Sequence, residues 1–169
     1  MSMVGGGDPG RKRKFAMRAD AMSIGDDYWI EDEAGTKAFH VDGKAARMRD
    51  TWVLEDAAGA EVATIREKKL TVRDKIKIEL ADGTEAVVRK ARIGNRFVVE
   101  MDGRTDLKVH GDILDHEYDV DRDGEGKIAE ISKKWFRIRD TYGVEVERDE
   151  DSVLVLAVTV AVDALADGR

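Results

Sequence analysis

The C-terminal sequence "SVLVLAVTVAVDALADGR" is the feature that most constrains how this chain can fold. From Val153 to Val162 every residue is apolar except Thr159. The apolar stretch ends at Ala166 and is interrupted by Asp163, so it is shorter than the roughly 20 apolar residues that a transmembrane helix needs. Stretches of this length are more often helices buried in a protein core, and a membrane tail anchor is the alternative.

The valines of this run favour a strand, whereas its length and its beginning favour a helix. Ser152 is a candidate N-cap, and the acidic residues 149–151 lie where the dipole of a helix is positive. A helix that is apolar on every face must be surrounded by protein. We therefore predict a helix over residues 153–166 that is buried on all sides, with the rest of the chain wrapped around it.

The remainder of the chain supplies short strand-like runs between turn signals. The predicted strands cover residues 28–32, 37–42, 51–56, 61–68, 75–80, 85–91, 96–101, 105–110, 116–121, 127–136 and 143–148. Asp-Gly and Gly-Asn turns at spacings of roughly 8–12 residues are typical of an all-β sandwich or barrel. About eleven or twelve antiparallel strands that close into a barrel around the terminal helix would leave no exposed sheet edge.

A faint internal repeat supports two equivalent halves. The segments "EDAAGAEVATIREKK" and "VDRDGEGKIAEISKKW" each have an Asp, a Gly three residues later and an apolar-Ala-x-Ile run that ends in basic residues. Ala63 and Ile65 correspond to Ala129 and Ile131 in this alignment. Two pseudo-equivalent hairpins are the interpretation, and chance similarity between two hairpins is the alternative.

Two segments carry a resemblance to a known family. Residues 131–135 (ISKKW), residues 140–144 (DTYGV) and the apolar tail with Asp163 resemble the C-terminal signature of the LURP-one-related family, in the tubby C-terminal-like superfamily that also includes the phospholipid scramblases. The segment 51–68 (TWVLEDAAGAEVATIREK) resembles a first-half motif of the same family. The resemblance covers most of the chain from about Phe15. It implies a closed barrel of twelve antiparallel strands around a central hydrophobic helix.

Composition limits the function and the location. The formal net charge of −7 argues against general nucleic-acid binding. The chain has no cysteine, which excludes disulfides, thiolate nucleophiles and sulfur-ligated metal sites. The N-terminal residues have no apolar stretch typical of a secretory signal, so we expect a cytoplasmic protein. We predict a flexible Gly-rich and basic leader over residues 1–14 and a single domain over residues 15–169.

One acidic segment has the spacing of a calcium-binding loop. Asp119, Asp121, Asp123 and Glu130 stand at the positions that ligands occupy in an EF-hand. The flanking sequences alternate like strands, however, and Gly126 replaces the usual β-branched residue. We predict that the segment is an acidic hairpin turn rather than a metal site.

No pattern in the sequence indicates catalysis or a cofactor. His40, His110 and His116 are the only histidines, and their neighbours form no metal-binding motif. The few serines occupy no nucleophile elbow, and no glycine-rich loop joins a strand to a helix. We therefore expect a protein that is not an enzyme and holds no cofactor, with an enzyme whose site at the barrel rim escapes recognition as an alternative.

Basic residues crowd the middle of the chain and provide a candidate surface for anionic lipid head groups. The candidate residues are Lys68, Lys69, Arg73, Lys75 and Lys77. Tubby proteins of the superfamily bind phosphoinositides through basic side chains, although their motif has no visible match here. A solvated barrel exterior is the competing interpretation.

We expect a non-catalytic binding or scaffolding module of the LURP-one-related type, whose partner is an anionic membrane lipid or another protein. A peripheral phosphoinositide binder, or a scramblase-like factor, is the alternative.

Overall fold

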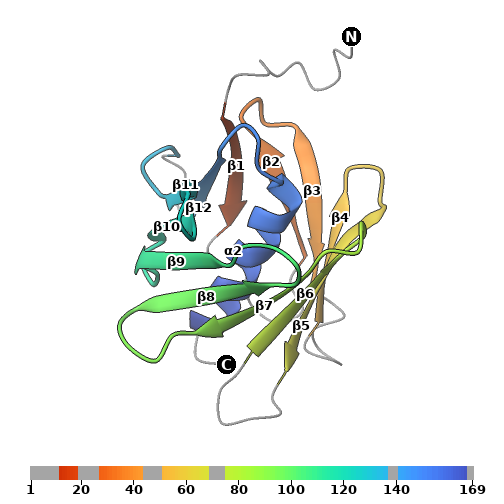
Figure 1. Cartoon of the computed structure of the whole chain (residues 1–169). Helices are drawn as coiled ribbons and strands as arrows, with labels where there is room; N and C mark the ends of the chain where they lie inside the picture. Colours follow the sequence, from red (N-terminus) through yellow and green to blue (C-terminus); the bar gives the residue numbers. More distant parts are fainter. Residues whose placement is uncertain (1–11, 19–26, 44–50, 69–74, 137–140, 167–169) are drawn as a thin grey trace.

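The computed structural model describes residues 12–18, 27–43, 51–68, 75–136 and 141–166 of the 169-residue chain. The described part is a closed antiparallel β-barrel with a helix inside it, as predicted (Figure 1). The strands are β1 (Arg13–Arg18), β2 (Tyr28–Asp32), β3 (Lys37–Asp42), β4 (Thr51–Asp56), β5 (Glu61–Lys68), β6 (Lys75–Leu80), β7 (Glu85–Lys90), β8 (Arg96–Met101), β9 (Leu107–Asp112), β10 (Glu117–Arg122), β11 (Gly126–Ser132) and β12 (Thr141–Val146). The helix is α2 (Ser152–Ala166).

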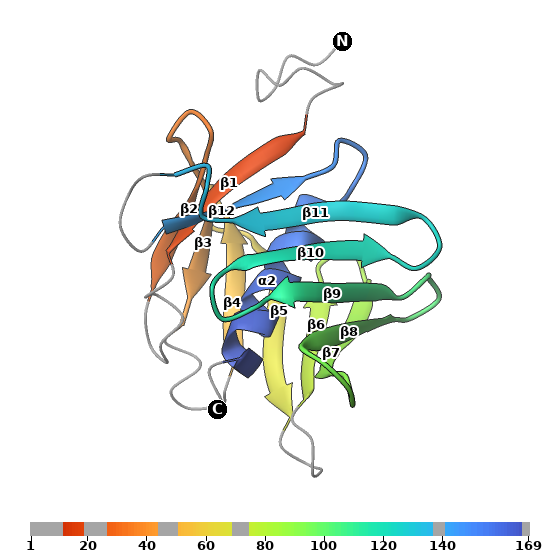
Figure 2. The same ribbon diagram turned by 90° about the vertical axis from the view of Figure 1, so that its left-hand side faces the viewer.

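Each strand pairs with the next one along the chain, and β12 returns to pair with β1. Connections between strands therefore alternate between the two ends of the barrel. The connections at residues 33–36, 57–60, 81–84, 102–106, 123–125 and 147–151 lie at one end, which we call the turn end. The opposite end, where β1, β3, β5, β7, β9 and β11 finish and the β7–β8 and β9–β10 connections lie, is the loop end. Figure 2 shows β9, β10, β11 and β12 side by side across the front of the barrel.

Strand β1 is the element that was not predicted from the sequence. Its residues Phe15 and Met17 are buried and alternate with Ala16, as in other strands of the barrel. The basic residues around them resembled an extension of the leader, so the alternation was missed. The predicted strand at 127–136 is also too long, because β11 ends at Ser132.

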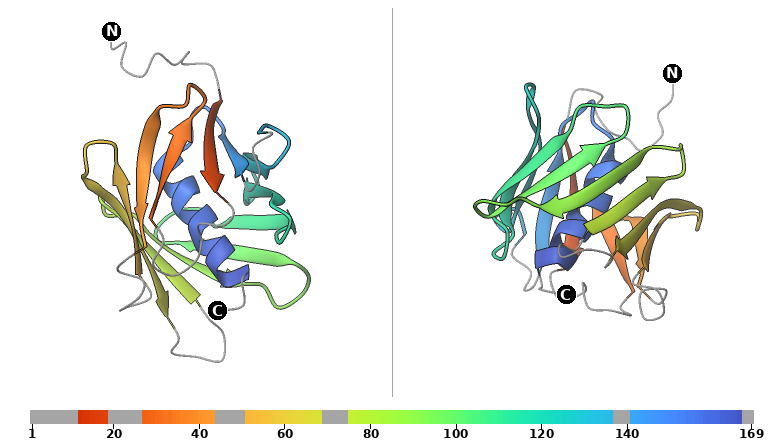
Figure 3. Two further views of the ribbon diagram at one scale, coloured as in Figure 1. Left: turned by 180° about the vertical axis from the view of Figure 1, so that it is seen from behind. Right: turned by 60° about the horizontal axis from the view of Figure 1, so that its bottom comes forward.

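The helix α2 begins where β12 ends at the turn end and runs through the barrel towards the loop end (Figure 3). The residues from Leu154 to Ala164 are all buried, which confirms the predicted core helix. The carboxylate of Asp151 accepts the backbone N–H bonds of Val153 and Leu154, so Asp151 and not Ser152 is the N-cap. Within the described residues, no helix is long and apolar enough to cross a membrane.

The acidic residues at the turn end have a structural role in the tight turns. Asp32 accepts backbone N–H bonds from residues 34 and 36, and Asp56 accepts the equivalent bonds from residues 58 and 60. Gly35 and Gly59 follow with φ of 79° and 89°, a left-handed conformation that favours glycine. The turn end is therefore acidic partly because aspartate stabilises its turns.

The two repeated segments form equivalent hairpins, six strands apart in the barrel. In each hairpin the Ala and the Ile of the repeat point inwards. The strand register shifts directly after the inward pair that contains the Ala. The equivalent pairs are Trp52 with Ile65 and Leu54 with Ala63 in β4–β5, and Tyr118 with Ile131 and Val120 with Ala129 in β10–β11. The shared register supports two pseudo-equivalent halves.

Candidate functional site

A carboxylate lies inside the barrel near the end of α2. Asp163 is only 4% exposed, and the hydroxyls of Tyr118 and Tyr142 donate hydrogen bonds to its two oxygens. The hydroxyl of Tyr118 is 3.4 Å from Oδ1. Tyr28 is the third tyrosine of the chain, is buried, and its phenol also experiences the charge of Asp163. All tyrosines of the protein thus surround one carboxylate, from the loop-end starts of β2, β10 and β12.

This environment keeps the phenols protonated. Burial raises the pKa of Tyr28, Tyr118 and Tyr142 well above 10, and the negative charge of Asp163 raises the pKa of each further. The phenols therefore act as hydrogen-bond donors that replace water around the carboxylate. The arrangement suits an anchor for the helix better than a nucleophile, which needs a lowered pKa.

His116 closes this cluster at the loop end. Its ring stacks on that of Tyr142, with centroids 4.2 Å apart and an interplanar angle of 9°. Its Nδ1 lies 3.7 Å from Oδ1 of Asp163, and its side chain is 15% exposed. The residue has φ of 54°, in the left-handed region that non-glycine residues seldom adopt. The sequence signal that would have identified the cluster is the single charge within the apolar helix.

A second cluster, on the outer face of the barrel, explains another part of the C-terminal motif. A Cβ at Gly143 would lie 2.7 Å from Cε3 of Trp135 and 2.8 Å from Cε2 of Phe136. The two rings therefore rest on the backbone of β12. The ammonium groups of Lys14 and Lys134 lie 5.3 and 5.0 Å from the centroid of the Trp135 ring. This packing places Trp135 and Phe136 on the barrel exterior rather than in the core around α2.

The acidic segment of β10 and β11 forms a hairpin whose carboxylates face basic partners. Asp121 lies 2.7 Å from His110, Asp123 lies 3.3 Å from Lys108, and Glu130 contacts two lysines. Asp119 stands opposite Glu130 in the strand register. In the parts of the chain that the structure describes, no group of three or more His, Asp or Glu side chains could hold a metal ion. The absence of calcium binding stays a prediction.

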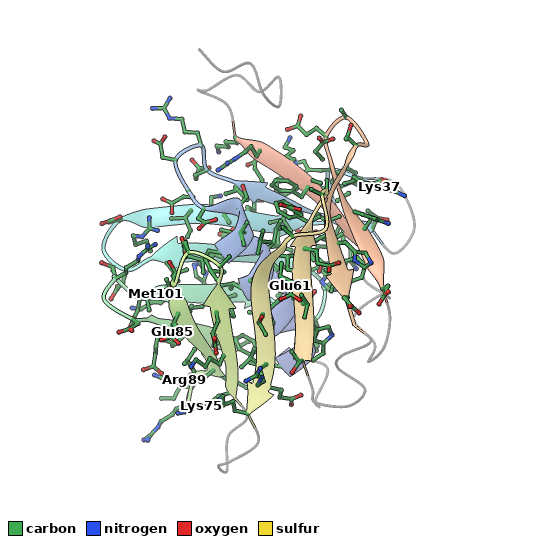
Figure 4. The ribbon with its side chains drawn as sticks, turned by 90° about the vertical axis from the view of Figure 1, so that its right-hand side faces the viewer. Lys37, Glu61, Lys75, Glu85, Arg89 and Met101 are labelled. Carbon is green, nitrogen blue, oxygen red and sulfur yellow. The ribbon has the colours of Figure 1, made fainter. Side chains whose placement is uncertain are left out.

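The structure describes three of the five predicted lipid-binding residues, Lys68, Lys75 and Lys77. Lys69 and Arg73 lie outside the described residues. Lys68 and Lys75 are cross-strand neighbours at the loop end, and Lys75 also stands opposite Arg89, beside which it lies in Figure 4. Among the described residues, neither Lys68 nor Lys75 has a carboxylate within ion-pair distance. Lys77 is different, because its ammonium contacts Glu79 and Glu85, which raise its pKa and offset its charge.

The connection between β7 and β8 adds a feature that the sequence analysis missed. Ile93 is 85% exposed at its tip, and Lys90, Arg92 and Arg96 around it are exposed as well. A single apolar residue between arginines in a turn is the signal that could have revealed this site. Leu114, 72% exposed, lies in the β9–β10 connection at the same end.

One hydrogen bond links the β7–β8 connection to the end of β9. The side-chain amide of Asn95 donates to the carbonyl oxygen of Gly111, with 3.3 Å between the two atoms. Figure 1 shows the β7–β8 and β9–β10 connections on one side of the barrel. We call the loop-end surface formed by Lys68, Lys75, Lys90, Arg92, Ile93, Arg96 and Leu114 the basic tip.

One comparison with known proteins bears on the fold and another on the family. A comparison with curated proteins finds no match. A crystal structure of a protein from Arabidopsis thaliana is similar, with a TM-score of 0.70 and 21% sequence identity over 94% of this chain and 96% of that one. At this identity the likeness shows the fold alone. The sequence model of one family matches residues 13–163, which include both hairpin repeats, the Trp135–Gly143 packing and Asp163. The chain belongs to the LURP-one-related family.

Proposed function

We propose that the protein is a non-catalytic binding module that docks on anionic membrane surfaces through the basic tip. Single exposed apolar residues are common on protein surfaces and need no explanation. Here, however, the two most exposed large hydrophobic side chains of the described residues, Ile93 and Leu114, lie at the same end of the barrel. The exposed cations on both sides of Ile93 are the observation that carries the proposal.

The expected energies suit reversible binding. Each basic residue near an anionic surface contributes about 1 kcal/mol, and full burial of an isoleucine side chain contributes about 1.5–3 kcal/mol. Asp115, in the same connection as Leu114, is held by Lys133 at 3.0 Å, which limits its repulsion from anionic lipids. A few cations and one or two aliphatic side chains give attachment that salt and lipid composition can reverse.

The charges at the opposite end of the barrel favour an orientation in which the basic tip faces the membrane. The turns of the turn end carry Asp32, Asp56 and Asp82, whereas Glu150 near the start of α2 is paired with Arg122. An anionic membrane would therefore attract one end of the barrel and repel the other. Inside the barrel, α2 is buried and the raised pKa of the phenols keeps them protonated as hydrogen-bond donors.

A vesicle sedimentation assay tests the proposal. The full chain is mixed with phosphatidylcholine vesicles, with vesicles containing about 30% phosphatidylserine, and with vesicles that also contain a phosphoinositide. Binding is expected only with anionic lipid, and it should weaken as salt rises from low to physiological concentration. Ile93→Ser should weaken binding without changing its dependence on salt.

A matched pair of variants separates local charge from total charge. Arg92→Glu with Arg96→Glu reverses two cations at the basic tip, while Arg104→Glu with Arg148→Glu makes the same charge change at the turn end. The first pair should abolish sedimentation and the second should leave it nearly unchanged. Equal losses, or no sedimentation of the wild-type protein at low salt, would refute the proposal and favour a protein partner.

A further inference from the structure

Trp29 is an exposed aromatic side chain on the outer face of β2. It is 38% exposed, whereas Trp52 is buried in the core and Trp135 packs against Gly143. Exposed tryptophans are rare, and they are enriched where proteins bind one another. Strand β2 lies six strands from β8 around the barrel, so this surface is separate from the β7–β8 connection of the basic tip.

One side of the indole already contacts a cation from the same chain. The ammonium of Lys37 lies 5.0 Å from the centroid of the Trp29 ring. Lys37 is itself exposed, and Figure 4 shows it away from Lys75 and Arg89. At an exposed site such a contact is weak, so another cation can replace it.

Two carboxylates are held beside the ring through His40. The imidazole of His40 lies 4.9 Å from the Trp29 ring, tilted by 45°. Its Nδ1 is 2.9 Å from Oε1 of Glu55, and its Nε2 is 3.8 Å from Oδ2 of Asp27. The backbone N–H of Gly43 donates to the other oxygen of Asp27 at 3.1 Å, which fixes this carboxylate.

We propose that this surface binds a basic peptide segment of a partner protein, with an arginine stacked on Trp29 in place of Lys37. A guanidinium is planar, stacks on aromatic faces and donates to carboxylates at the same time, which matches an indole whose neighbour His40 contacts Asp27 and Glu55. Lys37 then acts as an internal competitor for the ring. The module would join a basic partner on one side of the barrel to the surface bound by its basic tip.

Binding of a fluorescent arginine-rich peptide, followed by anisotropy without vesicles, tests this inference. Trp29→Ala leaves the net charge unchanged and should weaken binding about two- to fivefold, the contribution of one exposed cation–π contact. Lys37→Gln should strengthen binding by a similar factor. Lys108→Gln, on the other side of the barrel, makes the same charge change and should have a smaller effect.

Nuclear magnetic resonance spectra test whether the peptide contacts Trp29. The indole N–H signal of Trp29, identified with Trp29→Phe, should shift as the arginine peptide is added, and a glutamate peptide of equal length should leave it unmoved. Wild-type affinity in Trp29→Ala would overturn the inference, as would equal effects of Lys37→Gln and Lys108→Gln. Because no lipid is present, either result is independent of the membrane proposal.

Discussion

Asp163 is the residue that ties the helix to particular strands. The remaining buried side chains of α2 are Val, Leu or Ala, apart from Ser152 at its first position and Thr159, whose hydroxyl donates to the carbonyl of Val155 within the helix. Such a uniform surface could pack in several rotations or registers. One carboxylate that accepts hydrogen bonds from phenols on β10 and β12 favours a single arrangement.

Removal of this carboxylate should destabilise the barrel. Asp163→Ala leaves buried phenol hydroxyls without an acceptor, and each unsatisfied group costs about 1–3 kcal/mol, so the free energy of unfolding should fall by roughly 2–5 kcal/mol. Asp163→Asn should cost less, because its amide oxygen still accepts a hydrogen bond. Urea unfolding followed by circular dichroism measures both. Asp149→Ala, an exposed control, should change stability by less than about 0.5 kcal/mol.

Gly143 illustrates a glycine required by packing rather than by backbone conformation. In Gly143→Ala the new methyl group would clash with the rings of Trp135 and Phe136, and the variant should lose about 1–3 kcal/mol of stability. In a Trp135→Ala, Phe136→Ala background the same substitution should cost close to nothing, because the space is then free. If Gly143→Ala lowered the free energy of unfolding as much in the double-alanine background as in the wild type, measured by urea unfolding, this explanation would be wrong.

At the scale of elements, α2 and the barrel stabilise each other. The helix has no polar face for water, and it occupies the interior of a closed barrel of twelve strands. Asp151, which caps α2, is the last residue of the connection from β12, so the helix can enter the barrel directly from the last strand.

Leu156→Asp should therefore prevent folding. Leu156 is fully buried, and an unpaired charge at this depth costs several kcal/mol, comparable with the total stability of a small domain. Near-ultraviolet circular dichroism and thermal melting should show no cooperative transition. Leu114→Asp introduces the same group at an exposed position and should melt like the wild type. A cooperatively melting Leu156→Asp protein would disprove the core role of the helix.

At the scale of the whole molecule, charge is distributed unevenly between the two ends of the barrel. The turn end gathers aspartates for the geometry of its turns, and the loop end carries the exposed arginines near Ile93. The tyrosines lie just inside the loop end, on strands from different parts of the chain. Their protonation therefore depends on an intact barrel.

Stability should fall at alkaline pH. In the unfolded chain the phenols titrate near pH 10, whereas in the folded barrel burial and Asp163 raise the pKa of all three. Above pH 10 the unfolded chain therefore releases protons that the folded protein retains. Each phenol then lowers the free energy of unfolding by up to about 1.4 kcal/mol per pH unit, and the contribution is constant below about pH 9.

Phenolate absorbance at 295 nm and far-ultraviolet circular dichroism, recorded together from pH 8 to pH 12, measure this effect. The phenolate signal should appear only as the β-sheet signal is lost. Ionisation near pH 10 with the barrel intact would show that the phenols are accessible to water.

The sequence by itself determined most of the secondary structure and the need for closure. A run too apolar for the surface and too short for a membrane required a surrounding shell, and the regular turns supplied strands to build it. Alternation identified most strands because inward and outward residues differ in polarity. It failed at β1, where Arg13, Lys14 and Arg18 flank the inward pair Phe15 and Met17.

Only the tertiary structure decided which polar residues act together. Asp163 is far in sequence from Tyr28 and Tyr118, and no local pattern relates them; barrel closure brings their strands to one end of the helix. The same holds for Lys77, which forms ion pairs with Glu79 and Glu85, and for Ile93, whose exposure depends on where its turn lies. Periodicity is a local property of the chain, whereas charge pairing and surface patches depend on contacts between distant segments.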